Sequence, residues 1–459
     1  MSTHSQLFSP AGEPHFSLEG LRLPDPIPAG RRREHVPPLI DLDGANIFVM
    51  VMSLLFVAQM ATYSAVLFTL AVIVYALRHR GSLREVLRVQ GFFLLFPAYA
   101  VLSTLWSGAP ADTLKHSLEF LLTVVAALLV TQARNRRAVM FALFGAFAVY
   151  SLASLLFGGM VHVGTTGTVA LSGLADSKNE EATTVTTGAI IALAWFFIGL
   201  KTRSFLQSGL AAVVLAVEIY SALLAKSAGA MAALGVGIMT FLLLAALIKG
   251  GRRLRVAVVG FGGISALTLT MIFLIFTGPI IDAVSSWFGK DVTLTGRTYL
   301  WTRARDLIME HPIFGQGFAA FWQQGNLDAE GLWQFAHIAS RSGFNFHNTS
   351  YDILVSLGWI GLTLFMLTLI VGMVKMAAAY VRRPSLLAAF WLAMGASMVA
   401  RLPVETMGTY EFSFATILLF AMFGYAAKAK ELNARRESQS AREASGWTAS
   451  PLPAGSYAP

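Results

Sequence analysis

The sequence predicts an all-α, polytopic membrane protein with about 12 transmembrane helices. Of its 459 residues, 56% are hydrophobic and only 13% are charged, whereas soluble domains carry about 25% charged residues. Apolar runs long enough for a membrane span recur along most of the chain, and about 20 apolar residues in a helix cross a bilayer core. The lipid bilayer is therefore the expected environment of this chain.

The predicted spans follow one another in order. Residues 46–77 are almost uncharged and form a run longer than one crossing helix needs, so we expect two short spans with a break near Gln59 to Tyr63. Ten further apolar segments lie near residues 90–106, 112–131, 138–158, 184–200, 205–223, 229–248, 255–276, 350–375, 386–401 and 409–427. An even number of spans places both termini on the same side.

The distribution of cations orients the predicted bundle. With both termini in the cytoplasm, most lysines and arginines fall in cytoplasmic segments, as the positive-inside rule requires. The exceptions on or near the outer side are Lys115, Lys178, Lys226, Lys290, Arg297, Arg303, Arg305, Arg341 and Arg401. Because these cations run against the bias, they are the first candidates for function.

The chain divides into five predicted segments. Pro, Gly and charged residues dominate 1–44, and Ala, Ser and charged residues dominate 428–459, so both are expected to be disordered cytoplasmic tails. About nine spans occupy 45–276 and about three occupy 349–427. Between them, residues 277–348 contain helix-like stretches, which favours an ordered external, periplasmic subdomain over a linker.

The first candidate site residues lie in the predicted helix that Pro312 ends. On a helical wheel Arg297 points toward the apolar face, where a guanidinium requires an anionic partner. That partner is a substrate anion, or else Asp306, Glu310 or a carbonyl that simply fixes the subdomain. Trp301, one turn further on, is placed to pack on a sugar face or to anchor the chain at the membrane interface.

The segment FNFHNTSY supplies the second pair of candidates, at the entrance to a predicted span. His347 can act as a general base near neutral pH, and Asn348 can orient a hydroxyl group. Both lie at the membrane surface, where a lipid-linked substrate presents its head group. The alternative is a helix cap with interfacial hydrogen bonds.

Three other external cations are candidate phosphate ligands. Lys226 and Lys178 lie at the outer ends of spans, where each either binds phosphate or snorkels to the surface. Arg401 lies four residues before Glu405, at the outer end of another span. These two either form a structural ion pair or belong to a polar cavity.

Several classes of chemistry leave no trace in the sequence. The chain has no cysteine, so it has neither disulfides nor thiolate metal sites. It contains no P-loop, GxSxG, HExxH or dinucleotide fingerprint, and its cations do not form the basic stripe of a nucleic-acid-binding domain. We expect no cofactor, no metal and no nucleic acid. Asp41 and Asp43 resemble a DxD pair but lie where a helix start is expected.

An ordered set of motifs resembles the O-antigen ligase and polysaccharide polymerase superfamily. The pattern is GRTxxW, then HPxxGxG, then HNxxxDxLxxLGxxGL, near the C-terminal end of a polytopic chain. Here it reads Gly296-Arg297-Thr298 with Trp301, His311-Pro312 with Gly315 and Gly317, and His347-Asn348 with Leu357-Gly358 and Gly361-Leu362. TLTGRT, together with AKSAGA at residues 225–230, is most similar to exopolysaccharide polymerases of the succinoglycan type.

The resemblance implies a GT-C-like, metal-independent glycosyltransferase of the bacterial inner membrane. Its substrate would be an undecaprenyl-diphosphate-linked oligosaccharide at the outer face, and its partners would include chain-length regulator and export proteins. An acceptor sugar hydroxyl would attack an anomeric carbon and release undecaprenyl diphosphate. Arg297 and Lys226 would bind the diphosphate, with Lys178 and Arg401 as weaker contributors, and His347 would be the base. Many ligases of the superfamily have Arg in place of Lys226, which favours the polymerase branch.

Three other functions remain open at this point. A ligase that transfers glycan to lipid A core or to a protein would carry nearly the same motifs. A flippase or transporter would also have many spans, but it should show repeated halves with polar residues near the midplane, whereas the polar candidates here gather at one face. A non-catalytic assembly partner would use the external subdomain only for docking.

Overall fold

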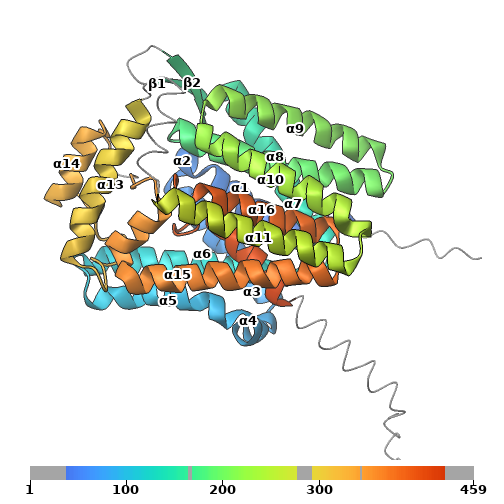
Figure 1. Cartoon of the computed structure of the whole chain (residues 1–459), viewed down its shortest axis with the longest axis horizontal. Helices are drawn as coiled ribbons and strands as arrows, with labels where there is room; N and C mark the ends of the chain where they lie inside the picture. Colours follow the sequence, from blue (N-terminus) through green and yellow to red (C-terminus); the bar gives the residue numbers. More distant parts are fainter. Residues whose placement is uncertain (1–37, 164–167, 276–291, 342–343, 429–459) are drawn as a thin grey trace, which may run out of the picture. The chain divides into compact units, whose positions relative to one another are not determined.

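The computed structural model of the protein describes residues 38–163, 168–275, 292–341 and 344–428. These residues belong to one compact unit, and nearly all of its secondary structure is helical (Figure 1). The predicted N-terminal tail lies outside the described residues up to Pro37, and 429–459 of the C-terminal tail lie outside as well. Residues 277–291 of the predicted external subdomain are also outside.

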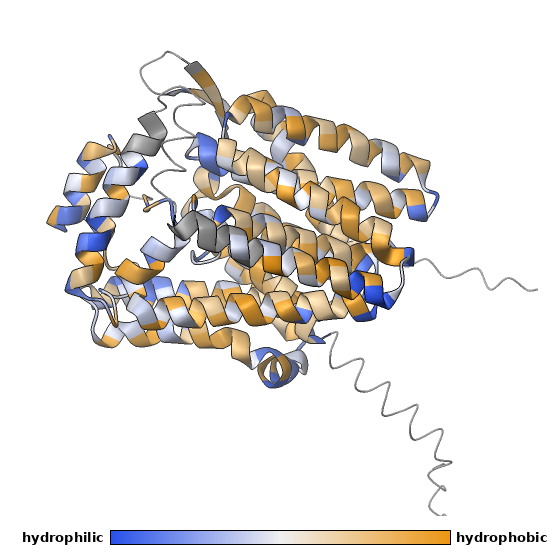
Figure 2. Cartoon of the chain, in the orientation of Figure 1, coloured by the Kyte–Doolittle hydropathy of each residue, from blue (hydrophilic) through white to orange (hydrophobic). Residues whose placement is uncertain are grey.

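The described helices have the character of a polytopic membrane protein. Seven are long and apolar enough to cross a membrane, and their ribbons are mainly hydrophobic (Figure 2). These are Ser82–Leu105, which joins α4 (Ser82–Gln90), η2 (Gly91–Leu94), α5 (Leu95–Leu102) and η3 (Ser103–Leu105); α6 (Pro110–Val130); α7 (Arg136–Phe157); α8 (Lys178–Lys201); α9 (Phe205–Ala225); Ala228–Lys249, which joins α10 (Ala228–Ala246) and η4 (Leu247–Lys249); and α15 (Thr349–Arg382).

Shorter apolar helices complete the bundle. They are α1 (Leu42–Leu55), α3 (Thr62–Arg78), α16 (Leu386–Arg401) and Phe414–Lys428. A further long helix, α11, runs from Arg252 to Ile275. The total of about 12 spans stays a prediction, because length and composition alone do not show that each of these helices crosses the membrane.

The first apolar run forms two packed helices. The chain breaks after α1, passes through the short α2 (Val57–Met60) and enters α3 at Ala61, which has a φ of 46°. A left-handed alanine cannot continue a helix. The Ser64 hydroxyl donates to the Ser53 carbonyl and holds α3 against α1. At the start of α1, the Asp41 carboxylate accepts the Gly44 N–H at 2.7 Å, so this acidic residue caps a helix.

One element departs from the predicted all-α fold. Between α7 and α8 the chain forms a two-stranded antiparallel hairpin, β1 (Gly159–Val163) and β2 (Thr168–Gly173). β1 contains two valines, and β2 contains one threonine and one valine; β-branched residues favour extended backbone. The sequence analysis assigned no element to the connection between the predicted spans 138–158 and 184–200, where this hairpin lies.

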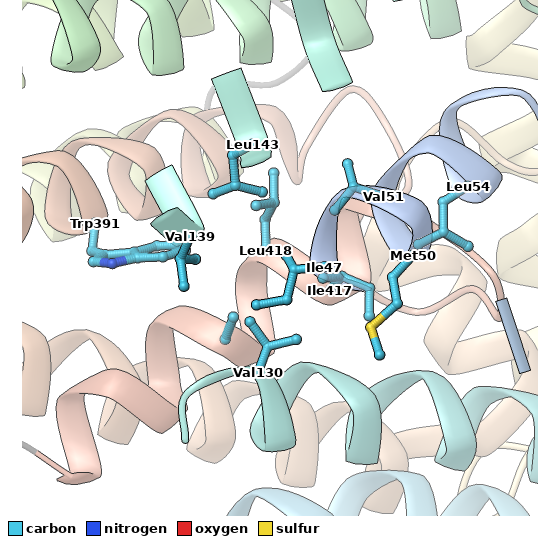
Figure 3. Close-up of a pocket in the computed structure, with 11 residues that line it drawn as sticks. Ile47, Met50, Val51, Leu54, Val130, Val139, Leu143, Trp391, Ile417 and Leu418 are labelled. Carbon is cyan, nitrogen blue, oxygen red and sulfur yellow. The ribbon is translucent and has the colours of Figure 1, made fainter. Parts of the chain in front are cut away.

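Small residues allow the helices of the bundle to approach closely. A Cβ added to Gly237 of α10 would overlap Ile190 of α8, and one added to Gly372 of α15 would overlap Phe423 of the last helix. Small side chains serve this purpose in membrane bundles generally. One cavity, of about 10 Å³, lies among apolar side chains of α1, α6 and α7, Trp391 of α16 and side chains of the last helix (Figure 3). A cavity of that size holds no sugar.

The predicted external subdomain has its own apolar core, which includes Leu354 and Val355 from the first turns of α15. It contains α13 (Val292–Glu310) and α14 (Leu327–Phe335). The Phe318 N–H donates to the Ser103 hydroxyl at 3.0 Å, and the Thr113 hydroxyl donates to the Phe318 carbonyl at 2.8 Å. These bonds fasten the subdomain to η3 and α6.

The HPxxGxG segment of the subdomain fits into a break in α15. The helix is interrupted at Gly358, which has a φ of 62°. Four backbone hydrogen bonds join the two segments: Gln316 N–H to Val355 O at 2.9 Å, Gly317 N–H to Ser356 O at 2.8 Å, Trp359 N–H to Pro312 O at 2.9 Å and Ile360 N–H to Ile313 O at 3.3 Å. A Cβ on Gly315 would collide with the backbone of α15, and one on Gly358 with the Ile313 carbonyl. The motif glycines are therefore required for this contact.

Candidate active site

One partly buried carboxylate connects the two leading sequence candidates. Glu405, in the loop between α16 and the last helix, accepts a hydrogen bond from Arg297 Nη2 at its Oε1 (2.8 Å). Its Oε2 lies 3.1 Å from His347 Nδ1. Three residues from distant parts of the sequence, Arg297, Glu405 and His347, thus form one hydrogen-bonded network, which we call the triad.

The local backbone holds His347 in an uncommon conformation. Its φ is 49°, and its N–H donates to the Asn345 side-chain carbonyl at 2.7 Å. Non-glycine residues in this left-handed region store strain and are frequent at functional sites. Asn348 follows as the N-cap of α15, where its side chain accepts the N–H groups of Ser350 and Tyr351. The imidazole is therefore presented at the start of a long helix.

Asn348 is better explained as a structural residue than as a substrate ligand. Both sides of its amide are in use, since the oxygen caps α15 and Nδ2 donates to the Pro403 carbonyl at 3.0 Å. The predicted alternative of a helix cap describes its position. Its function here is to join the His347 segment to the loop that carries Glu405.

The loop from 402 to 413, which we call the Glu405 loop, is fixed by further hydrogen bonds. The Arg401 carbonyl accepts the Glu405 N–H at 2.8 Å. The Thr349 hydroxyl donates to the Glu405 carbonyl at 2.8 Å and accepts the Met407 N–H at 3.0 Å. Because Thr349 lies two residues after His347, the same short segment holds both His347 and Glu405.

Asp352, the acidic residue of the HNxxxD pattern, provides a second connection. Its carboxylate accepts the Phe346 N–H at 3.3 Å and the Thr406 hydroxyl. Phe346 precedes His347, and Thr406 follows Glu405. Asp352 therefore holds the segment that carries His347 and the loop that carries Glu405. Its hydrogen bonds go to the neighbours of these two residues.

The electrostatics favour an ionised Glu405. Burial raises the pKa of the Glu405 carboxyl, but the hydrogen bond with His347 and the charge of Arg297 outweigh burial, so that the pKa lies below its ordinary value. A carboxylate only accepts hydrogen bonds, so Nδ1 carries the proton in the pair and Nε2 of a neutral His347 has a lone pair. This is the tautomer that a general base requires.

The triad is partly open to its surroundings. The exposed fractions of the Arg297, Glu405 and His347 side chains are 16%, 16% and 22%. Arg297 uses one nitrogen of its guanidinium toward Glu405, and a guanidinium has five N–H donors. All three side chains thus keep a solvent-exposed fraction, and Arg297 keeps N–H groups that do not face Glu405.

The two candidate lysines lie in neighbouring turns beside the Glu405 loop. Lys226 ends α9 in a left-handed conformation, with a φ of 50°, and Lys178 Nζ donates to its carbonyl at 3.4 Å. A Cβ added to Gly229, at the start of α10, would lie 3.2 Å from Val404. The Lys226 turn therefore packs next to the loop, and the Lys226 side chain itself is exposed.

Arg401 and Trp301 do not have the surroundings expected of substrate ligands. Arg401 is 1% exposed and donates to the Thr183 carbonyl (3.3 Å) and to the Thr186 hydroxyl, so its guanidinium joins α16 to α8. Trp301 is 4% exposed, its Nε1–H donates to the Phe346 carbonyl at 2.8 Å, and its ring stacks on Tyr351. These surroundings favour a structural role for both residues, whereas contact of Arg401 with a diphosphate and of Trp301 with a sugar stay predictions.

Two other external cations stabilise the subdomain. Arg303 pairs with Asp306 and Asp328, and Arg341 pairs with Glu330. The nearby carboxylates raise the pKa of both guanidinium groups. The structure thus separates cations that bind their own subdomain from Arg297, which reaches across to the Glu405 loop.

The role of Glu405 was missed by the sequence reasoning. Its proximity to Arg401 in the sequence suggested a pair between these two, but the Glu405 carboxylate is occupied by Arg297 and His347. The sequence signal for Glu405 was its position. It is an acidic residue at the predicted outer end of the next-to-last span, on the same predicted side as Arg297 and His347. Pairing it across more than 50 residues required the fold.

Comparisons with known proteins identify the family of this chain. Residues 211–366 match a family described as O-antigen ligase, a range that includes Lys226, Arg297 and His347. The chain is also 32% identical over 318 residues to the exopolysaccharide production protein ExoQ of Rhizobium meliloti (strain 1021), covering 68% of this chain and 71% of the relative. With the motifs, the apolar helices and the triad in place, the similarity to ExoQ shows that this chain belongs to the O-antigen ligase and polysaccharide polymerase family of membrane proteins.

Proposed function

We propose that the protein is a polymerase of the bacterial inner membrane that joins undecaprenyl-diphosphate-linked oligosaccharide repeat units into exopolysaccharide. The observation that carries this proposal is the triad, which combines a correctly oriented base with a cation at the outer end of the bundle. The similarity to an exopolysaccharide production protein supports the polymer as the product. The reaction takes place at the outer face, with both termini in the cytoplasm.

His347 acts as the general base in the proposed reaction. Glu405 accepts the Nδ1–H, so Nε2 takes the proton from the attacking hydroxyl of the acceptor sugar. The sugar oxygen forms a bond to the anomeric carbon of the second substrate, and the bond from that carbon to the diphosphate oxygen breaks. The leaving group is undecaprenyl diphosphate, and Glu405 stabilises the imidazolium that forms.

Arg297 and Lys226 contact the leaving diphosphate in this proposal. The N–H groups of Arg297 that do not face Glu405 can donate to phosphate oxygens in pairs, whereas Lys226 acts as a point charge from the neighbouring turn. Positive charge near the leaving group stabilises the negative charge that develops on it. Lys178, which supports the Lys226 turn, contributes mainly through that support. This chemistry assigns no step to a metal ion.

The proposal is tested with a matched pair of histidine variants. His347 and His337 both have positive φ values, 49° and 57°, and both lie in or next to the external subdomain. Asn tolerates this backbone conformation, so His347→Asn and His337→Asn impose the same small backbone change. Each variant is incubated in nanodiscs with a defined lipid-linked repeat unit, and polymer and free lipid diphosphate are measured.

The expected result is that His347→Asn forms no measurable polymer while His337→Asn retains the wild-type rate. In cells, single repeat units should accumulate in the His347→Asn strain at normal protein levels. Equal polymer length in wild-type and His347→Asn cells would refute the assignment of the base. Failure of purified wild-type protein to release lipid diphosphate would refute the reaction itself.

A ligase is the second candidate, because the matching family is described as O-antigen ligase. The same triad would then activate a hydroxyl of lipid A core or of a protein acceptor. The two functions are separated by supplying both acceptors together: a polymerase lengthens the lipid-linked unit, whereas a ligase transfers one unit to the other acceptor.

A further inference from the structure

A second histidine–carboxylate cluster lies at the same end of the bundle as the triad. It consists of His116 and Glu119 from the first turns of α6 and Glu411 from the Glu405 loop. His116 Nδ1 is 2.8 Å from Glu411 Oε1 and 3.4 Å from Glu119 Oε2. The exposed fractions of the three side chains are 26%, 27% and 21%. None of these residues takes part in the proposed reaction.

The arrangement of the cluster differs from that of a simple ion pair. A protonated Nδ1 has a single hydrogen, which points to one acceptor, yet two carboxylates face this nitrogen. The two carboxylates also repel each other at this range. A cation in place of the Nδ1 proton would be attracted by both carboxylates and would accept the nitrogen lone pair as well.

We propose that His116, Glu119 and Glu411 form a binding site for a divalent metal cation, with Zn²⁺ as the best fit. The three ligand atoms already lie within 4.8 Å of one another. Zinc binds imidazole nitrogen and carboxylate oxygen at about 2.0–2.2 Å, so tetrahedral ligands lie roughly 3.4 Å apart. The His116–Glu119 distance already has that value. Mg²⁺ fits less well, because it prefers an all-oxygen shell.

The proposed site would fasten the distal half of the Glu405 loop to α6. Glu411 is six residues beyond Glu405, and the neighbouring Phe412 N–H donates to the Thr123 hydroxyl of α6 at 3.0 Å. A bound cation would add a strong link beside this hydrogen bond and restrict the loop that carries the triad carboxylate. The proposal concerns this link and stands independently of the reaction proposed above.

The test measures zinc binding by the full-length protein in detergent after treatment with a chelator. The variants are His116→Ala, Glu119→Gln and Glu411→Gln. His79→Ala is the matched control, because His79 Nε2 faces the single carboxylate of Asp43 at 3.0 Å and so offers an imidazole–carboxylate pair without a third ligand. Each protein is equilibrated with zinc chloride, separated by gel filtration and analysed for metal content and for Tm.

We expect wild-type protein and His79→Ala to retain one more zinc ion per chain than the three site variants. Zinc should raise the Tm of these two proteins and leave the Tm of the site variants unchanged. Equal zinc content in wild-type and Glu411→Gln protein that elutes as a folded species would overturn the proposal. The same holds if magnesium displaces zinc from wild-type protein at equal concentration.

Discussion

The same loop contributes one glutamate to each of two histidines, and the third member distinguishes the clusters. Glu405 contacts His347 and, through its other oxygen, the cation Arg297. Glu411 contacts His116, which also faces a second carboxylate, Glu119. Where the third group is a cation, the carboxylate is charge-balanced and can orient a base. Where it is an anion, the cluster has an excess of negative charge and attracts a cation.

The largest expected difference follows from replacing each glutamate by glutamine. Glu405→Gln removes the charge that fixes the His347 tautomer and should lower the polymerisation rate about 10²–10⁴-fold. Glu411→Gln should keep most of the activity at low zinc, because Glu411 does not contact the triad. Initial rates of lipid diphosphate release from both purified variants provide the measurement. A loss of similar size in both would mean that the two clusters act as one site.

A smaller difference is expected between two arginines of α13. Arg297→Lys replaces planar, paired donors by a point charge and should cost about 2 kcal/mol, or roughly 30-fold in rate. Arg303→Lys changes only two exposed ion pairs, with Asp306 and Asp328, and should leave the rate within a factor of about two. Titration of both variants with the lipid-linked substrate separates effects on kcat from effects on KM. If Arg303→Lys is the slower enzyme, the distinction between these cations is wrong.

The two ends of the loop can be compared through two threonines. Thr349→Val removes a hydroxyl that binds the loop next to Glu405, and Thr123→Val removes one that binds it next to Glu411. Each change should lower the free energy of unfolding by about 1 kcal/mol. Only Thr349→Val should also slow polymerisation, and only Thr123→Val should weaken zinc binding. Thermal unfolding and the two functional assays, run on the same samples, test both statements.

The smallest expected effect concerns pH. The folded-state pKa of Glu405 lies below its ordinary value of 4.5, so its contribution to stability is complete above about pH 4.5 and is lost as the pH falls through the lower, folded-state value. Glu405→Gln should therefore flatten the decline of Tm between pH 5 and pH 3. A decline identical to that of the wild-type protein would show that the carboxylate is not stabilised by its two partners.

Sequence reasoning predicted the helical class, which the structure confirms, and it named Arg297 and His347 as candidates, which the structure joins through Glu405; their roles and the external position of residues 277–348 stay predictions. The apolar runs and the cations that run against the positive-inside rule are local signals, because each is recognised from residues close together in the chain. The connecting residue Glu405 and the positioning residue Asp352 depend on contacts between separate segments, which local patterns do not contain. Arg401 illustrates the same limit. Local sequence placed it at the end of an apolar helix, but its burial against α8 depends on helix packing.

The break in α15 has a consequence for the order in which the protein is made. Gly358 lies about two and a half turns into the helix, and the peptide groups around it are satisfied by residues 312–317, which are synthesised earlier. Unsatisfied peptide groups are costly in lipid. Residues 312–317 are therefore already present when the peptide groups around Gly358 need their hydrogen-bond partners. A chain released before α15 is made would leave residues 312–317 without the partners of these four hydrogen bonds.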